Sequence, residues 1–338
     1  MLTPQSPPTN AYLRMLNYMG WSLVIFLCVF TELATLDELL AGLWFGTAGV
    51  AISGLVSSFL YMAPFILGGI MFYVFGKQIK TQPVRCSVRI PSVFPLLILA
   101  GMAVITAAAY VNSWFCELIG YSIPPELVAP VDYGDASTVI QYMTIGLAPA
   151  FAEEFLFRGV IYGNLRPYGK VQAVLVSSAL FALMHQNIGQ FFYTFVGGMA
   201  MALMYELTGS IWCSIFFHLL NNELSVLTEV LYYGKYGEAV APFLNLFDLA
   251  ILLLGMVSIG ILILHYRKKS IEAKVEQEQG VFGKQGSTLP EAYDEPVTTA
   301  SVLRGMRTPG MIVFIILSLV ATTATYFVIR FGDVGDLL

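Results

Sequence analysis

The chain has 338 residues, of which 57% are hydrophobic and only 12% are charged. Soluble globular domains carry about 45–50% apolar and about 25% charged residues, so this chain has too little polar surface for a water-soluble fold. Its net charge of −5 argues against a nucleic-acid-binding surface. The four cysteines lie far apart, at Cys28, Cys86, Cys116 and Cys213, and predict neither a disulfide framework nor a thiolate metal site.

Long apolar stretches predict an all-α polytopic membrane protein with about eight to nine transmembrane helices around a polar cavity, because a span needs about 20 mostly apolar residues. The predicted spans, in chain order, are 16–36, 48–76, 93–118, 138–163, 171–187, 190–208, 210–231, 244–266 and 310–330. The first has no small-residue cleavage site after it, so we expect an uncleaved anchor and not a signal peptide.

The distribution of Lys and Arg predicts the orientation, because these residues gather on the cytoplasmic side of a membrane. With the N-terminus inside, 14 of the 17 basic residues fall on the inner side, and only Lys235 and Arg330 fall outside. The remaining one, Arg158, lies within a span. We therefore expect a multi-pass membrane protein with a cytoplasmic N-terminus.

The same reading divides the chain into five parts. The segment 267–309 is rich in charge and then in Gly, Pro, Ser and Thr, so it is expected to be a disordered cytoplasmic linker. The parts are three N-terminal spans (1–137), a catalytic helical core (138–231), an eighth span (232–266), the linker (267–309) and a C-terminal span (310–338).

The fourth predicted span contains three charged residues, Glu153, Glu154 and Arg158. An unpaired charge at the bilayer centre costs about 2.5–3.5 kcal/mol even on the most lenient scale, so these groups need partners or a wet cavity. Residues four apart share a helix face, which pairs Glu154 with Arg158 and leaves Glu153 as a spare carboxylate. An ion-pair cluster that only locks helices together is the structural alternative.

Two further spans carry polar residues at similar depth. Phe181 and His185 lie four residues apart in the fifth span, and His218 and Asn222 lie four apart in the seventh. At about 1.5 Å per residue, Glu153 and His185 each lie roughly 20 Å from a cytoplasmic anchor, and His218 and Asn222 lie roughly 13 and 19 Å from the inner end of their span. This agreement in depth predicts that the groups meet.

A buried carboxylate beside imidazoles is suited to activating water. We expect Glu153 to take a proton from a water that attacks a peptide carbonyl, with His185 orienting that water and Phe181 holding the His185 ring. A developing oxyanion needs fixed donors, which His218 and Asn222 supply. The Glu154–Arg158 pair would support the helix.

The segments EEFLFR (153–158), FALMH (181–185) and HLLNN (218–222) resemble the motifs EExxxR, FxxxH and HxxxN of the CPBP family of intramembrane endopeptidases. That family includes the type II CAAX prenyl endopeptidases (the Ras-converting enzymes) and bacterial bacteriocin-processing and self-immunity proteins. The resemblance covers roughly 149–224, where the sequence between the motifs is also similar to bacterial members, so it implies a bacterial plasma membrane. It implies that Glu153 and His185 activate water, that His218 and Asn222 form the oxyanion site, and that Glu154 and Arg158 are structural.

We expect no cofactor. The absence of an HExxH motif argues against a zincin site. The resemblance to the family implies that a glutamate activates the water without a tightly held zinc ion. A single divalent metal such as zinc, held by Glu153, His185 and His218, remains the alternative.

The expected partners are the lipid bilayer and a membrane-associated peptide or protein substrate, with no nucleic acid. A non-proteolytic membrane scaffold or immunity-type binding protein is the second hypothesis. A secondary transporter with a proton relay is the third, and the sequence lacks the paired interrupted spans that such a fold would show.

Overall fold

A computed structural model describes residues 8–41, 46–121, 146–278 and 298–331. These residues form helices and connecting segments without a β-strand, as the composition predicts; the described part has one isolated antiparallel bridge, Cys86–Ser210. The chain is an all-α, multi-pass integral membrane protein. Six of its described helical segments are long and apolar enough to cross a membrane: Asn10–Asp37, Gly54–Phe75, Phe94–Leu118, Ile188–Thr208, Gly237–Glu272 and Pro309–Phe327.

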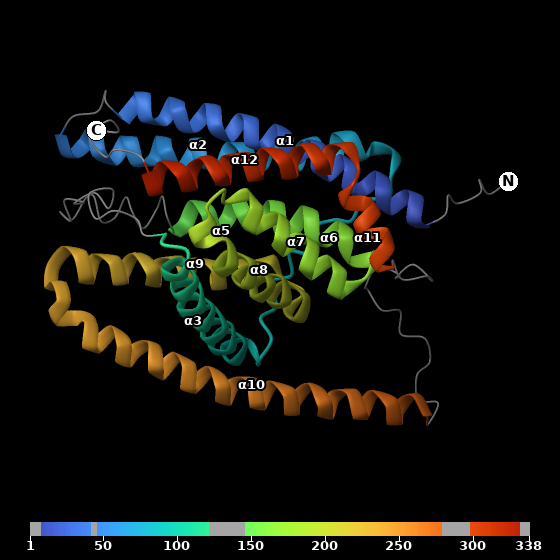
Figure 1. Ribbon diagram of the computed structural model, residues 1–338. Coiled ribbons are helices and arrows are strands. Elements are labelled where there is room, and N and C mark those ends of the chain that lie inside the picture. The colour runs from blue at the N-terminus through green and yellow to red at the C-terminus, as the bar shows by residue number, and fades with distance from the viewer. Residues whose placement is uncertain (1–7, 42–45, 122–145, 279–297, 332–338) are drawn as a thin grey trace.

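The bundle has two outer groups of helices on opposite sides of a central group (Figure 1). In the first group, α2 and α12 both pack along α1, and in the second, α3 packs along α10. Their bounds are α1 Pro8–Ala41, α2 Gly46–Phe75, α3 Phe94–Leu118, α10 Ala241–Glu278 and α12 Pro309–Phe331.

The central helices carry the predicted site residues. They are α5 (Ala148–Glu153), the π-helical segment η4 (Glu154–Tyr162), α6 (Gly163–Leu165), α7 (Lys170–Met184), α8 (Ile188–Thr208) and α9 (Ile211–Glu229). The remaining elements are short and connect the longer helices: η1 (Gly76–Gln78), η5 (Arg166–Tyr168), η6 (Val230–Tyr236), η7 (Gly237–Val240) and α11 (Thr299–Met306).

Two apolar cores hold these groups together. The larger is shared by α1, α2, η4, α7 and α12 and includes Phe26, Phe65 and Phe157, all fully buried. The smaller joins α3, α8, α9 and α10 around Phe217. The central helices are therefore packed against apolar side chains from both outer groups.

The turn between α7 and α8 follows from local chemistry. Asn187 adopts an extended conformation before α8, and its side-chain oxygen accepts a hydrogen bond from the backbone N–H of Gly189 at 2.8 Å. This is the N-cap arrangement that Asn favours. Tyr121 also donates to the same oxygen at 2.8 Å. At its other end α8 stops at Gly209, whose φ of 67° is the left-handed conformation that glycine adopts without strain.

The predicted spans agree with helices of the structure, with differences at their ends. The fourth, 138–163, begins outside the described residues and continues as α5, η4 and α6. The prediction that 267–309 is an irregular linker is wrong at both ends. Helix α10 continues to Glu278, because RKKSIEAKVEQE contains strong helix formers and neither Gly nor Pro. Near the other end α11 begins after Thr298, whose hydroxyl accepts from the Ser301 N–H. Residues 279–297 lie outside the described part.

Candidate active site

Glu153 ends α5 inside the bundle, with only 3% of the residue exposed. The hydroxyl of Tyr61, from α2, donates a hydrogen bond to its Oε1 atom. Its Oε2 atom is buried and has no hydrogen-bond partner among the residues that the structure describes. The Nε2 atom of His218 lies 3.8 Å from this Oε2. One oxygen of Glu153 is therefore held, and the other faces an imidazole across a distance too long for a hydrogen bond.

Glu154, fully buried, contacts three polar side chains from two elements. Arg158 lies 2.8 Å away in the ion pair that the spacing predicts. The Nδ1 atom of His218 lies 2.9 Å from the same Oε1 atom, and Ser214 donates to Oε2. One cation and two hydrogen-bond partners beside a carboxylate stabilise its ionised form. Glu154 therefore contacts the candidate catalytic imidazole directly as well as forming the predicted pair with Arg158.

These residues lie where the helix changes from α to π geometry, since η4 begins at Glu154. A π-helix bonds each residue to one five positions away and is frequent at functional sites. The sequence analysis did not predict it. The Glu154–Arg158 pair nevertheless forms, because the long arginine side chain spans the widened turn.

Arg158 reaches across the bundle to α8 and α7. Its guanidinium donates to the carbonyl of Gly198 at 3.1 Å and lies 4.5 Å from the ring centroid of Phe181. A Cβ on Gly198 would come within 3.2 Å of that ring. The absence of a side chain at Gly198 thus lets α8 approach closely enough to accept the arginine.

Phe181 and His185 end up as the sequence predicts, with rings 4.7 Å apart in an edge-on arrangement. The Nδ1 atom of His185 lies 2.8 Å from the carbonyl oxygen of Phe181. Since a carbonyl only accepts, Nδ1 carries the proton and Nε2 of a neutral ring keeps its lone pair. The Phe181 ring also lies 6.2 Å from the His218 ring.

Asn222 lies one turn after His218 on α9. Its side-chain oxygen accepts a hydrogen bond from Asn221 at 3.2 Å. Asn221 in turn donates to the hydroxyl of Tyr193, from α8, at 2.9 Å. The carboxamide predicted to bind an oxyanion is therefore oriented by a chain of side chains from two helices.

The structure brings Glu153, Glu154, Arg158, Phe181, His185 and His218 into one cluster, with Asn222 on the next turn of α9. Sequence reasoning missed three contributors. Ser214 precedes His218 by one helical turn, so its place on the same face was available as a signal. Tyr61 and Tyr193 come from other helices, and no local spacing connects them to the motifs.

Two of the cavities in the described part of the chain are lined by residues that bond to Glu153 or Asn222. The larger, of about 690 Å³, lies between α3, α8, α9 and α10, and Tyr193 and Asn221 form part of its wall. The smaller, of about 180 Å³, lies between α1 and α2, and Tyr61 forms part of its wall.

Metal ligation was the alternative for Glu153, His185 and His218. Within the described ranges, no three His, Cys, Asp or Glu side chains are grouped so as to hold a metal ion. The Nδ1 atom of His218 faces Glu154, so only Nε2 of this ring could coordinate a metal ion. The expectation of a metal-independent site stays a prediction.

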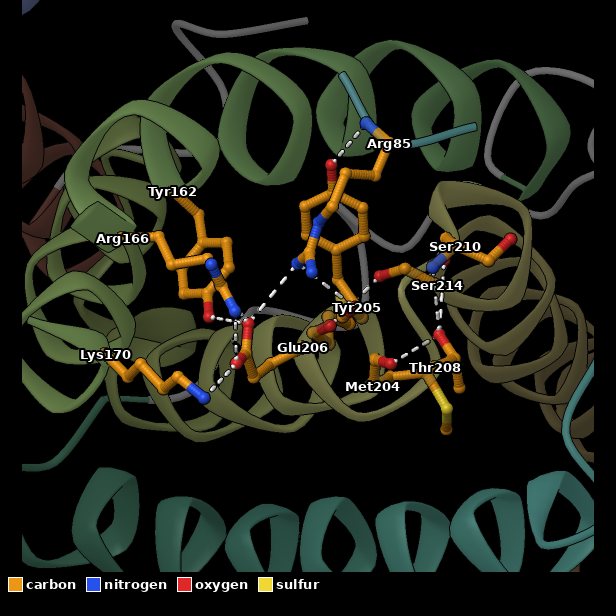
Figure 2. A network of polar contacts seen from close by, with 11 residues as sticks. Arg85, Tyr162, Arg166, Lys170, Met204, Tyr205, Glu206, Thr208, Ser210 and Ser214 are labelled. Atoms are coloured by element: carbon orange, nitrogen blue, oxygen red, sulfur yellow. Dashed lines mark hydrogen bonds and ion pairs between the residues drawn. The ribbon is translucent and has the colours of Figure 1, made fainter. Parts of the chain in front are cut away.

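A second polar cluster lies at the end of the bundle that is predicted to be cytoplasmic (Figure 2). Glu206 of α8 accepts from Arg166 at 2.5 and 3.0 Å, from Tyr162 at 2.9 Å and from Lys170 at 2.8 Å. Arg85 lies 3.3 Å from the same carboxylate. Arg85 comes from one segment that the sequence assigns to the inner membrane face, and Arg166 and Lys170 come from another, so two predicted inner segments meet at one carboxylate.

Comparison with known proteins adds to this geometry. Residues 135–224 match a family model described as type II CAAX prenyl endopeptidase Rce1-like. This part of the chain, called the Rce1-like segment from here on, is similar to that family. The predicted resemblance is thereby confirmed for the part of the chain that carries all three motifs.

A Bacillus subtilis (strain 168) protein named "Putative membrane peptidase YdiL" is 33% identical to this chain over 81 residues. The aligned region covers 23% of this chain and 32% of that protein, so the chain matches about a third of its relative. No solved structure matches the chain.

Proposed function

We propose that the chain is an intramembrane endopeptidase that hydrolyses a peptide bond of a membrane-associated substrate. The observation that carries the proposal is the position of the Oε2 atom of Glu153, which is buried within a membrane-spanning bundle and lies 3.8 Å from Nε2 of His218, with no hydrogen-bond partner in the described part of the chain. A water beside this pair can contact both atoms. The Rce1-like segment and the relative named a membrane peptidase support the same reading.

In the proposed reaction Glu153 is the general base. Its Oε2 atom takes a proton from the water as the water oxygen attacks the peptide carbonyl. Nε2 of His185 accepts the water's second hydrogen as a hydrogen bond and so orients the attack, because its Nδ1 proton is engaged by Phe181. The proton on Glu153 then passes to the leaving amine as the C–N bond breaks.

His218 and Asn222 are proposed to stabilise the oxyanion by donating hydrogen bonds to it. Since Nδ1 of His218 is turned to Glu154, its Nε2 donates a hydrogen bond only when the ring is doubly protonated. The Glu154 carboxylate stabilises such an imidazolium, as the acid of a catalytic triad does for its histidine. We therefore assign Glu154 a role in charge stabilisation beyond its ion pair with Arg158.

The larger cavity gives room for the substrate. Its volume of about 690 Å³ falls within the range of about 300–1,000 Å³ that is usual for ligand sites. It reaches Asn221, which orients Asn222. A peptide in this cavity would lie against Asn221, on the helix that also carries His218 and Asn222. No residue described here selects a prenyl group, so the proposed substrate class is a membrane-tethered peptide.

The decisive test uses purified protein in liposomes with a set of membrane-tethered peptides and mass spectrometry of the products. Glu153→Gln should abolish cleavage and leave the thermal unfolding transition in place. Glu117→Gln, the same change at an exposed acid near the end of α3, should cleave as the unmodified protein does. Full activity of Glu153→Gln would refute the mechanism.

The same variants separate the enzyme from a non-proteolytic scaffold, for which the dense bonding around Glu154 is the supporting observation. A scaffold would keep its cellular function in Glu153→Gln and lose it only in variants that unfold.

The orientation of the chain in the membrane is tested independently. A protease-sensitive tag at the N-terminus should be cleaved only from the cytoplasmic side of the membrane.

A further inference from the structure

A hydrolase whose active site is buried in a membrane-spanning bundle must take up water, its second substrate, from outside the site. Glu153 and His218 are only 3% and 4% exposed, and each peptide bond cleaved consumes one water. The inference below rests on the proposed function and concerns how that water arrives.

The small cavity between α1 and α2 has the properties of a hydrated space. Its volume is about 180 Å³, which corresponds to about six waters at about 30 Å³ each. Three polar side chains line it, Asp37, Ser57 and Tyr61. A buried water needs two to four polar partners, and the Ser57 hydroxyl already donates to Asp37 at 2.7 Å.

Tyr61 joins this cavity to the candidate base. It forms part of the cavity wall, and its hydroxyl donates to Oε1 of Glu153. The ring is fixed between Phe30 at 5.6 Å and Phe65 at 5.2 Å. A side chain fixed in this way holds the glutamate in one orientation and keeps one face toward the cavity.

We propose that the α1–α2 cavity is a water site that replenishes Glu153, and that Tyr61 is the positioning residue at its inner end. Tyr61 holds Oε1, so Oε2 is the oxygen that takes the proton. In each cycle the water oxygen bonds to the carbonyl carbon, its proton passes through Oε2 to the amine, and the C–N bond breaks. A water from the cavity then replaces the one consumed.

Hydration is measured without reference to activity, by hydroxyl-radical footprinting of the full chain in liposomes. Tyr61 should be oxidised when radicals are generated from water within the bundle. Tyr12, 1% exposed and packed on Tyr168, is the internal standard for a dry tyrosine and should be spared. If Tyr61 is protected like Tyr12, the inference is overturned, whether or not the protein cleaves peptides.

Adjacent serines on α2 provide a matched pair of variants. Ser57 lines the cavity, whereas Ser58 bonds the Gly54 carbonyl and does not. Ser57→Leu should protect Tyr61 from oxidation and lower kcat about tenfold with KM unchanged, and Ser58→Leu should change neither. If Ser57→Leu unfolds, Ala34→Leu fills the same cavity from α1. Equal effects of both serine variants would overturn the cavity's role.

The positioning role is tested by Tyr61→Phe, which removes one hydroxyl and keeps the ring. It should lower kcat about tenfold and leave KM and the unfolding transition unchanged. The control is Tyr73→Phe on the same helix as Tyr61. It removes a hydroxyl that donates to the Gln82 carbonyl and should have no effect on kcat. Unchanged kcat in Tyr61→Phe refutes the positioning role while leaving the proposed function standing. If unmodified protein cleaves nothing, the proposed function fails and the footprint still tests the water site.

Discussion

Replacement of Arg158 by methionine tests how strongly the buried charges stabilise the bundle. The change keeps most of the apolar stem and removes the guanidinium that neutralises Glu154, in a pair whose side chains are 1% and 0% exposed. Breaking a buried pair by removing one partner costs about 3–5 kcal/mol, because the other charge is left uncompensated. His218 and Ser214 still bond Glu154, so we expect the lower end, about 3 kcal/mol, or roughly 100-fold in the unfolding equilibrium.

The free energy of unfolding is measured in mixed micelles with increasing dodecyl sulfate. A matched control is Lys268→Met, which breaks another pair four residues apart, at 3.8 Å, with side chains 79% and 58% exposed. Exposed pairs contribute less than about 1 kcal/mol. The double variant Arg158→Met with Glu154→Gln should recover about half of the loss, because no bare charge remains. A cost below about 1 kcal/mol for Arg158→Met would refute the assignment of Glu154 and Arg158 as a desolvated ion pair.

Three further outcomes follow from the same geometry. His218→Gln, which keeps a polar side chain but removes the imidazole bonded to Glu154, should lower kcat by about 10²–10³ in the liposome assay while the protein stays folded; a loss below tenfold would argue against a role at the oxyanion. Glu206→Gln should weaken the cluster of Arg85, Arg166 and Lys170 and destabilise the fold by about 1–3 kcal/mol, without changing kcat in the fraction that remains folded. Exhaustive chelation should leave cleavage intact, and restoration of lost activity by zinc would favour the metal-dependent alternative.

Helices and pairs within one helix were predictable because their signals are local. A run of apolar residues locates a span, and a spacing of four places Glu154 beside Arg158 on any helical face. The distances of Glu153 and His185 from basic anchors also predicted their common depth. These signals depend on composition and on the rise per residue, both of which can be read directly from the chain.

Contacts between helices were not predictable in the same way. The spacing gave no reason for His218 to turn Nδ1 toward Glu154, since their separation of 64 residues is bridged only by packing. Tyr61 lies 92 residues from Glu153. The π geometry of η4 was not predicted either. Arg158 lies within this π-helical segment and reaches the Gly198 carbonyl of α8. The motifs identify the chemical groups, and tertiary packing decides which atoms of those groups face each other.

The hydrogen bond from α2 to the candidate base has a consequence for protein engineering. The Rce1-like segment begins at residue 135, yet the side chain that holds Glu153 is supplied from residue 61. A chimera that transplants only the motif-bearing helices into another scaffold would leave this carboxylate without its donor. Swaps between relatives should therefore exchange α2 and α5 together, so that the tyrosine and the glutamate travel as one unit.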